Sequence, residues 1–293
     1  MPDEVTLHQP ATLDDAIRLM DELGDDAKVV AGSTALTIML RQRLIEPSAL
    51  ISIGRLPHLD RIDVVDGHLR IGALVRHRDV ELSPVVREHL PVVAHTFGVV
   101  ANVRIRNAAT VGGVLAESDY ASDPPAVFLA LDAEVDAQGP KGARAIPIRE
   151  FFVAFYETSL DPKELITGIR IPLLPPGSSA VYEKYVTRSS EDRPCVGVAA
   201  VVRLAEDGTA VDLRVAVGAA AETPQRFGDL EAAALGQRLE PDVLATIADG
   251  YAERIESLDD LRGSAWYRTE MVRVWVRRVI EHATDRARGV APA

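Results

Sequence analysis

Hydrophobic residues at helical spacing mark the first segment of the chain. Thr12 is a residue type that caps helices, and Gly24 is a typical stop signal. Between them, apolar side chains recur at intervals of three and four and predict an amphipathic helix: Ala16, Leu19, Met20 and Leu23. The apolar runs at 28–31 and 50–53 predict buried strands. This first stretch therefore predicts a small α/β unit.

Turn signals and prolines divide the next stretch. Asp66-Gly67 lies between two apolar runs and predicts a β-hairpin. Ser83-Pro84 is typical of a helix start, and we expect one helix from there towards Phe97. The segment 101–116 is rich in Gly, Ala, Asn and Thr and has little periodicity, so we expect a loop. Further expected elements are a helix at 124–131 and strands at 134–137, 143–148 and 164–171.

A cluster of proline, glycine and serine at 172–179 predicts a domain boundary near residue 176. Beyond it, three β-type runs predict an antiparallel meander, and helices close the chain. The runs are 180–187, 196–204 and 210–219, and the helices are about 228–236, 240–256 and 264–288. The predicted class is α+β, with domains at 1–176 and 177–293.

Composition and charge narrow the possible functions. The 293 residues carry a net charge of −12, so the broad basic face that nucleic acids or anionic membranes would require is missing. The single cysteine, Cys195, cannot build a thiolate metal cluster within this chain. We expect it to be a buried structural thiol in a reducing compartment. The start at Met1–Val5 is acidic and no apolar run reaches membrane-spanning length, so we expect a cytoplasmic protein without membrane insertion.

Common catalytic signatures are missing from the sequence. It contains no GxGxxG, P-loop, GxSxG or HExxH pattern. The seven histidines are scattered without metal-ligand spacing, so structural or surface roles are expected for them. These observations predict no catalytic side chain and no metal ligand in this chain.

Two glycine-containing turns carry the remaining chemical signal. The first, 30–35, links a predicted strand to a helix, where small residues and backbone N–H groups suit a pyrophosphate. The second, 105–116, contains Gly112-Gly113 and is followed by carboxylates that suit ligand hydroxyls. Each turn alone could be an ordinary bend.

Taken together and in this order, the two turns resemble a known family. It is the FAD-binding medium subunit of molybdenum hydroxylases, the group that contains carbon monoxide dehydrogenase and xanthine dehydrogenase. The resemblance covers nearly the whole chain. The matching segments are Ala31-Gly32-Ser33-Thr34, Arg104-Ile105-Arg106-Asn107, Thr110-Val111-Gly112-Gly113, Asp119-Tyr120-Ala121-Ser122-Asp123, Phe151-Phe152, Tyr156-Glu157-Thr158, 164–172, Tyr182-Glu183-Lys184 and 263–268.

The resemblance implies a fold and a site. The fold has an FAD-binding domain of the PCMH type, with α/β subdomains of about 1–55 and 56–176, and a C-terminal flavoprotein domain at 177–293. The FAD pyrophosphate would be wrapped by Ala31, Gly32, Ser33, Thr34 and Ala35 together with Thr110, Val111, Gly112, Gly113 and Val114. Ala101 would pack near FAD, Asp123 would bond a ribityl or ribose hydroxyl, Leu165 or Ile166 would lie near the isoalloxazine, and Lys184 would lie near its polar edge.

The resemblance also implies partners and a role. A large subunit would hold molybdopterin and hydroxylate the substrate, and a small subunit would carry 2Fe-2S clusters. We expect a dimer of heterotrimers in which this chain's FAD collects electrons from the clusters and passes them to an external acceptor. The substrate lies on another chain, so this sequence does not name it.

The chain departs from the family pattern at three positions. Ser33 replaces a glycine, which fits if its φ is negative and its hydroxyl meets the phosphate. Tyr120 replaces a proline. Arg193 stands where carbon monoxide dehydrogenase flavoproteins place an aromatic over the flavin, and it could stack there or pair with Asp192.

Two alternative functions stay open at this point. One is a self-sufficient FAD-dependent oxidoreductase, which would need its own substrate pocket. The other is a non-catalytic scaffold with a decayed FAD site. Retention of Gly112, Gly113, Asp119 and Asp123 argues against decay, and the segment 263–268 argues for the partnered family.

Overall fold

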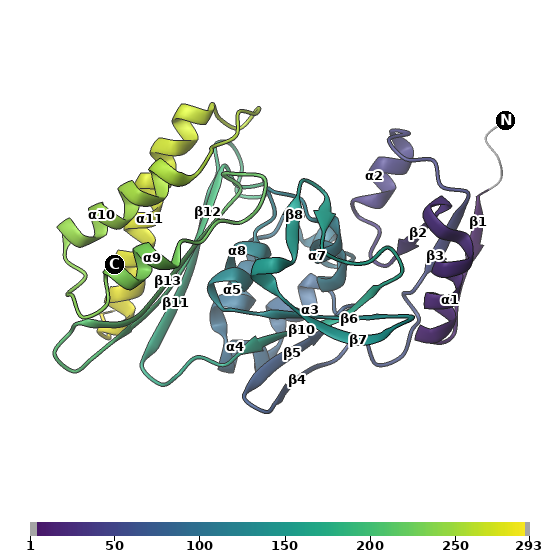
Figure 1. Ribbon diagram of the computed structural model, residues 1–293, viewed down its shortest axis with the longest axis horizontal. Helices are drawn as coiled ribbons and strands as arrows, with labels where there is room; N and C mark the ends of the chain where they lie inside the picture. The colour runs from purple at the N-terminus through teal and green to yellow at the C-terminus, as the bar shows by residue number, and fades with distance from the viewer. Residues whose placement is uncertain (1–4, 291–293) are drawn as a thin grey trace.

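The computed structural model describes residues 5–290. The acidic start at Met1–Val5, on which the expectation of a cytoplasmic protein partly rests, lies outside the described residues except for Val5. Three units follow one another along the long axis, with the N-terminal unit at one end and the C-terminal helices at the other (Figure 1). No helix within the described residues is long and apolar enough to cross a membrane.

The N-terminal unit is a small parallel sheet with helices. Its strands lie in the order β1-β3-β2. The Thr12 hydroxyl accepts the N–H of Asp15 at the start of α1, and Gly24 ends that helix with φ 59°, so the predicted caps are confirmed. The elements are β1 (Thr6–His8), α1 (Leu13–Leu23), the 3-10 turn η1 (Gly24–Asp26), β2 (Ala27–Val30), α2 (Leu36–Arg41) and β3 (Ala49–Ser52).

The central unit is a five-stranded antiparallel sheet with helices packed on it. Its strand order is β4-β5-β10-β6-β7, so β10, the last of these strands in the chain, lies at the centre. Asp66-Gly67 forms the predicted hairpin between β4 and β5. The strands are β4 (Ile62–Val65), β5 (His68–Gly72), β6 (Glu134–Gly139), β7 (Gly142–Pro147) and β10 (Leu165–Pro172), and β8 (Phe152–Ala154) pairs separately with β9 (Glu157–Thr158).

Two helix expectations in this unit were wrong. The single helix expected up to Phe97 is divided by Pro91, which starts a new helix because proline suits a first helical position. The segment expected to be a loop holds two short helices, whose N-termini are capped by the side chains of Asn102 and Thr110. The helices are α3 (His77–Leu82), α4 (Pro84–His89), α5 (Pro91–Val99), α6 (Val103–Arg106), α7 (Val111–Glu117) and α8 (Pro124–Ala130), and η2 is Ile148–Glu150.

The C-terminal unit is the predicted meander with three helices. The sheet packs one face on the central unit, since Tyr182, Ala199 and Val201 belong to the central core. Its other face packs on the last two helices. The elements are β11 (Ser178–Tyr185), β12 (Val196–Leu204), β13 (Ala210–Gly218), α9 (Gly228–Ala233), α10 (Pro241–Arg254) and α11 (Ala265–Ala287).

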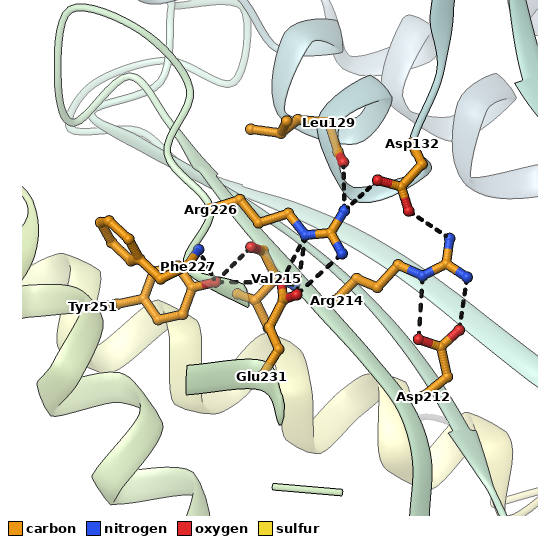
Figure 2. Close-up of polar contacts among 9 residues, drawn as sticks. All are labelled: Leu129, Asp132, Asp212, Arg214, Val215, Arg226, Phe227, Glu231 and Tyr251. Carbon is orange, nitrogen blue, oxygen red and sulfur yellow. Dashed lines mark hydrogen bonds and ion pairs between the residues drawn. The ribbon is translucent and has the colours of Figure 1, made fainter. Parts of the chain in front are cut away.

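A polar network, buried at Glu231 and half-exposed at Asp132, joins the C-terminal unit to the central one (Figure 2). Arg226 donates to the Leu129 carbonyl at the end of α8 and to Asp132, at 3.1 and 2.7 Å. Its other nitrogens bond Glu231, which is only 5% exposed and also accepts the N–H of Val215. Because every charge in this network is paired, it fixes the position of the C-terminal sheet against α8.

Candidate cofactor site

The two glycine turns lie against each other at the junction of the N-terminal and central units. A Cβ atom on Gly32 would lie 2.1 Å from the carbonyl oxygen of Ala108. A Cβ atom on Gly112 would lie 2.8 Å from the Cβ atom of Ala73. Glycine is therefore required at both positions, because the neighbouring segment lies too close to the backbone to leave room for a side chain.

In the second turn, the first backbone N–H groups of helix α7 donate to acceptors within the protein. Val111 donates to the Val75 carbonyl at 2.9 Å, and Gly112 donates to the Ala73 carbonyl at 2.8 Å. Gly113 donates to the hydroxyl of Thr110 at 3.2 Å. These bonds make the start of α7 rigid, and they leave its first N–H groups occupied.

The first turn differs from the second in its backbone N–H groups. Within the described chain, the N–H groups of residues 32–35 form none of the backbone–backbone hydrogen bonds, and all four residues are partly exposed. Ser33 has φ 60° and its hydroxyl lies 2.9 Å from that of Thr37, so the condition of a negative φ is not met. A serine in this left-handed conformation carries some strain. The first turn thus holds the N–H groups that are available to an anion.

Asp123 and Lys184 form a buried pair that crosses the boundary between the units. One Asp123 oxygen accepts the hydroxyl of Tyr182 at 2.7 Å, and the other lies 3.6 Å from Lys184 Nζ. Burial raises the pKa of Asp123 to about 6, although Lys184 and Tyr182 both act to lower it. Lys184 also donates to the carbonyls of Val99 at 2.6 Å and Asp192 at 3.0 Å. Its cation is therefore held against the C-terminal end of α5.

Comparison with known proteins decides the family. A family model described as "FAD binding domain in molybdopterin dehydrogenase" matches residues 3–174, and one described as "CO dehydrogenase flavoprotein C-terminal domain" matches residues 181–283. The chain belongs to the FAD-binding subunits of the molybdenum hydroxylases. The resemblance seen in the sequence and the predicted α+β fold are both confirmed.

Individual relatives match this FAD-binding subunit over nearly its whole length. The carbon monoxide dehydrogenase medium chain of Hydrogenophaga pseudoflava is 32% identical, covering 98% of this chain and 99% of the relative. The 6-hydroxypseudooxynicotine dehydrogenase complex subunit alpha of Paenarthrobacter nicotinovorans is 35% identical, covering 94% and 93%. A solved carbon monoxide dehydrogenase from Hydrogenophaga pseudoflava superposes with a TM-score of 0.93 at 34% identity, covering 97% of this chain and 98% of its own.

The other predicted contacts of the FAD-binding subunit have different surroundings. Ala101 is partly exposed and has φ 43°, which is unusual for alanine. Leu165 and Ile166 are both buried, at 5% and 6% exposure. Because neighbouring strand residues point to opposite faces, Leu165 packs in the N-terminal core and Ile166 in the central one. Their side chains pack in the N-terminal and central cores, and their backbone lies where these two cores meet.

Arg193 pairs with a different acid from the one considered in the sequence. Its guanidinium lies 2.6 Å from Asp119 and 3.9 Å from Glu117, two carboxylates at the end of α7. Asp192 instead accepts the N–H of Ser189. The pKa of Glu117 is raised by burial and by the neighbouring Asp119, while Arg193 acts to lower it. Arg193 thus ties the segment before β12 to the central unit.

Two residues near the turns were not assigned a cofactor role by sequence reasoning. The ring of His77 is 2% exposed, its Nε2 lies 3.2 Å from the Thr110 carbonyl, and burial lowers its pKa to about 4, so it is neutral. Arg106 bonds the carbonyls of Val100 and Ala101. The only sequence signal for Arg106 was its place in a matching segment, because its partners are not visible in the sequence.

Proposed function

We propose that this FAD-binding subunit is the electron-transfer flavoprotein of a heterotrimeric molybdenum hydroxylase. A large partner would hold molybdopterin, a small partner would supply electrons from 2Fe-2S clusters, and FAD on this chain would pass them to an external acceptor. The full-length likeness to medium subunits and medium chains of such dehydrogenases supports this role. We further propose that two heterotrimers associate, and that the complex is cytoplasmic, in keeping with the single buried cysteine.

The observation that carries the cofactor part of the proposal is the junction of the two glycine turns. The N–H groups of residues 32–35 would take the pyrophosphate, because they are the ones not used by the backbone. The segment 110–114 would back this cradle as a rigid support. Val99–Ala101, Leu165-Ile166 and Lys184 would border the rest of FAD, which supplies the redox chemistry when bound.

In this proposal Asp123 holds Lys184 in place, whereas the sequence resemblance implied a bond to a hydroxyl of FAD. Its carboxylate is 3% exposed and already faces Tyr182 and Lys184. This arrangement favours holding Lys184 in place over a direct bond to a hydroxyl of FAD. We also propose that the domains divide at residue 176, which lies between the end of β10 at Pro172 and the start of β11 at Ser178.

FAD binding is tested with a pair of glycine variants. The purified full chain, reconstituted with FAD, is expected to show flavin absorption and to quench flavin fluorescence on titration. Gly32→Ala is expected to lose binding, because its Cβ would meet the Ala108 carbonyl and push the turns apart. Gly54→Ala is the matched control in the same unit, since nothing lies within 4 Å of its Cβ position. A wild-type chain that takes up no FAD would refute the proposal.

The electron-transfer role is tested on the native complex. Affinity purification from the producing cell is expected to recover two partner chains, with molybdenum and iron found by elemental analysis. Reduction of the complex by its substrate should bleach the flavin absorption of this chain. Recovery of a lone chain that oxidises a substrate by itself would favour the self-sufficient oxidoreductase instead.

A further inference from the structure

We propose that Arg106 is a positioning residue that holds the turn at residues 99–102 in the shape that bound FAD requires. The inference rests on the proposed function, since it deepens the description of the same site. Arg106 belongs to the matching segment Arg104-Ile105-Arg106-Asn107, for which no role follows from the sequence.

The side chain of Arg106 folds back over the turn that precedes its own helix. Its Nη1 donates to the carbonyls of Val100 at 2.9 Å and Ala101 at 2.8 Å. Its Nε donates to Glu81 on α3 at 2.9 Å, and its side chain is only 13% exposed. A planar guanidinium can donate in several fixed directions at once, so one side chain fixes the turn to α3.

The turn needs such a restraint because its backbone is strained. Ala101 has φ 43°, in the left-handed region that residues with a Cβ atom avoid. Conformations of this kind persist only when their surroundings enforce them. On the other side of the turn, Lys184 donates to the carbonyl of Val99 at 2.6 Å. Three successive carbonyls, from Val99 to Ala101, are therefore bound by two cations that come from different domains.

Fixing the carbonyls also fixes where the N–H groups point. No peptide bond in the described part of the chain is cis, and in a planar trans peptide the N–H lies opposite to the carbonyl. The N–H groups of Ala101 and Asn102 therefore point away from Arg106. Neither forms a backbone–backbone hydrogen bond within residues 5–290, and both residues are partly exposed. They are thus donors without a backbone partner in the turn that is proposed to border FAD, and Arg106 sets their direction.

A purely structural role for Arg106 makes a different prediction. If its pair with Glu81 only stabilised the fold, loss of Arg106 would lower stability without changing the surroundings of a bound flavin. If it positions the turn, loss of Arg106 would also change the flavin's affinity and its spectroscopic signature. The two roles therefore predict different affinities and different spectra for bound FAD.

The test uses the full chain reconstituted with FAD. We expect Arg106→Gln to weaken FAD binding by about tenfold or more in a fluorescence titration, and to change the visible circular dichroism of bound FAD. The midpoint potential of the bound flavin should shift as well. Arg106→Lys keeps a cation with three donors, so we expect about threefold weaker binding and a smaller change of the same sign.

Arg170→Gln is the matched control. Arg170 lies in the same domain, is 26% exposed, and pairs with Asp136 and Glu134 at 2.8 and 3.2 Å. We expect it to lower thermal stability and leave the dichroism of bound FAD unchanged. Wild-type affinity and dichroism in Arg106→Gln, or an equal change in Arg170→Gln, would overturn the inference. If Arg106→Gln does not fold, an Arg106→Lys chain with wild-type binding and dichroism would overturn it. A wild-type chain that binds no FAD would instead refute the proposed function.

Discussion

The buried carboxyl of Asp123 should make the stability of this protein depend on pH in a direction opposite to that of an ordinary aspartate. Its pKa is raised from 3.8 to about 6 in the folded chain, mainly by burial. A raised pKa means that folding favours the protonated form. The stability gained from that proton is complete below pH 3.8 and is lost as the pH rises through about 6.

The size of the effect follows from the two pKa values. A gap of about two units, at about 1.36 kcal/mol for each unit, gives a total of about 3 kcal/mol. Only part of this is reached at usable pH. Between about pH 8 and about pH 5, linkage gives a gain of about 1.4 kcal/mol on acidification.

Asp123→Asn isolates this contribution because the asparagine does not titrate in this range. Urea unfolding of both proteins at intervals from about pH 5 to about pH 8 gives the difference in their unfolding free energies, in which all other titrating groups cancel. We expect the wild type to gain about 1.4 kcal/mol relative to Asp123→Asn over that range on acidification. Tyr182→Phe removes a hydrogen bond that lowers the pKa of Asp123, so its pH dependence should move to higher pH. A constant difference, or one of opposite sign, would refute the reasoning.

Three further outcomes are expected. Glu231→Gln should lower the free energy of unfolding by about 3 kcal/mol, because it removes the buried charge that pairs with Arg226 and leaves Arg226 only the half-exposed Asp132. An effect below about 1 kcal/mol in urea unfolding would contradict this. Thr12→Ala should cost about 1 kcal/mol through loss of the α1 cap, whereas Thr12→Ser should cost almost nothing in the same measurement. Cys195 is fully buried and burial raises its thiol pKa, so a thiol reagent should label the folded chain far more slowly than the urea-unfolded chain, and equal rates would show that the thiol is accessible.

Local sequence signals predicted the helices and strands well where caps, periodicity and turns all indicated the same element. The first helix has both its caps and its apolar face between Thr12 and Gly24, so its limits were visible without the fold. The meander after residue 177 was equally clear, because three long β-type runs follow one another and a turn at Glu206-Asp207-Gly208 joins the second to the third. The segment 101–116 was not clear. Its helices are too short to show a period, and they are held by contacts with α3 and β5.

The candidate site was predictable only as a set of residue types in order. The glycines of both turns stood out because small residues at a strand–helix turn suggest an approaching ligand. The sequence could not show that Gly112 donates to the Ala73 carbonyl, or that Arg193 pairs with Asp119. Both contacts join residues from different elements, and the packing of those elements decides them.

By itself, the sequence determined the family, the α+β class and the two glycine turns in which the backbone comes close to a neighbouring segment. These properties depend on local patterns and on residue types such as Gly32, whose lack of a side chain has the same meaning in any context. Only the tertiary structure decided which N–H groups are available, how Asp123 acquires its raised pKa, and which carbonyls Arg106 binds. Hydrogen-bond partners and burial depend on tertiary packing, because they arise only when segments distant in the chain come together.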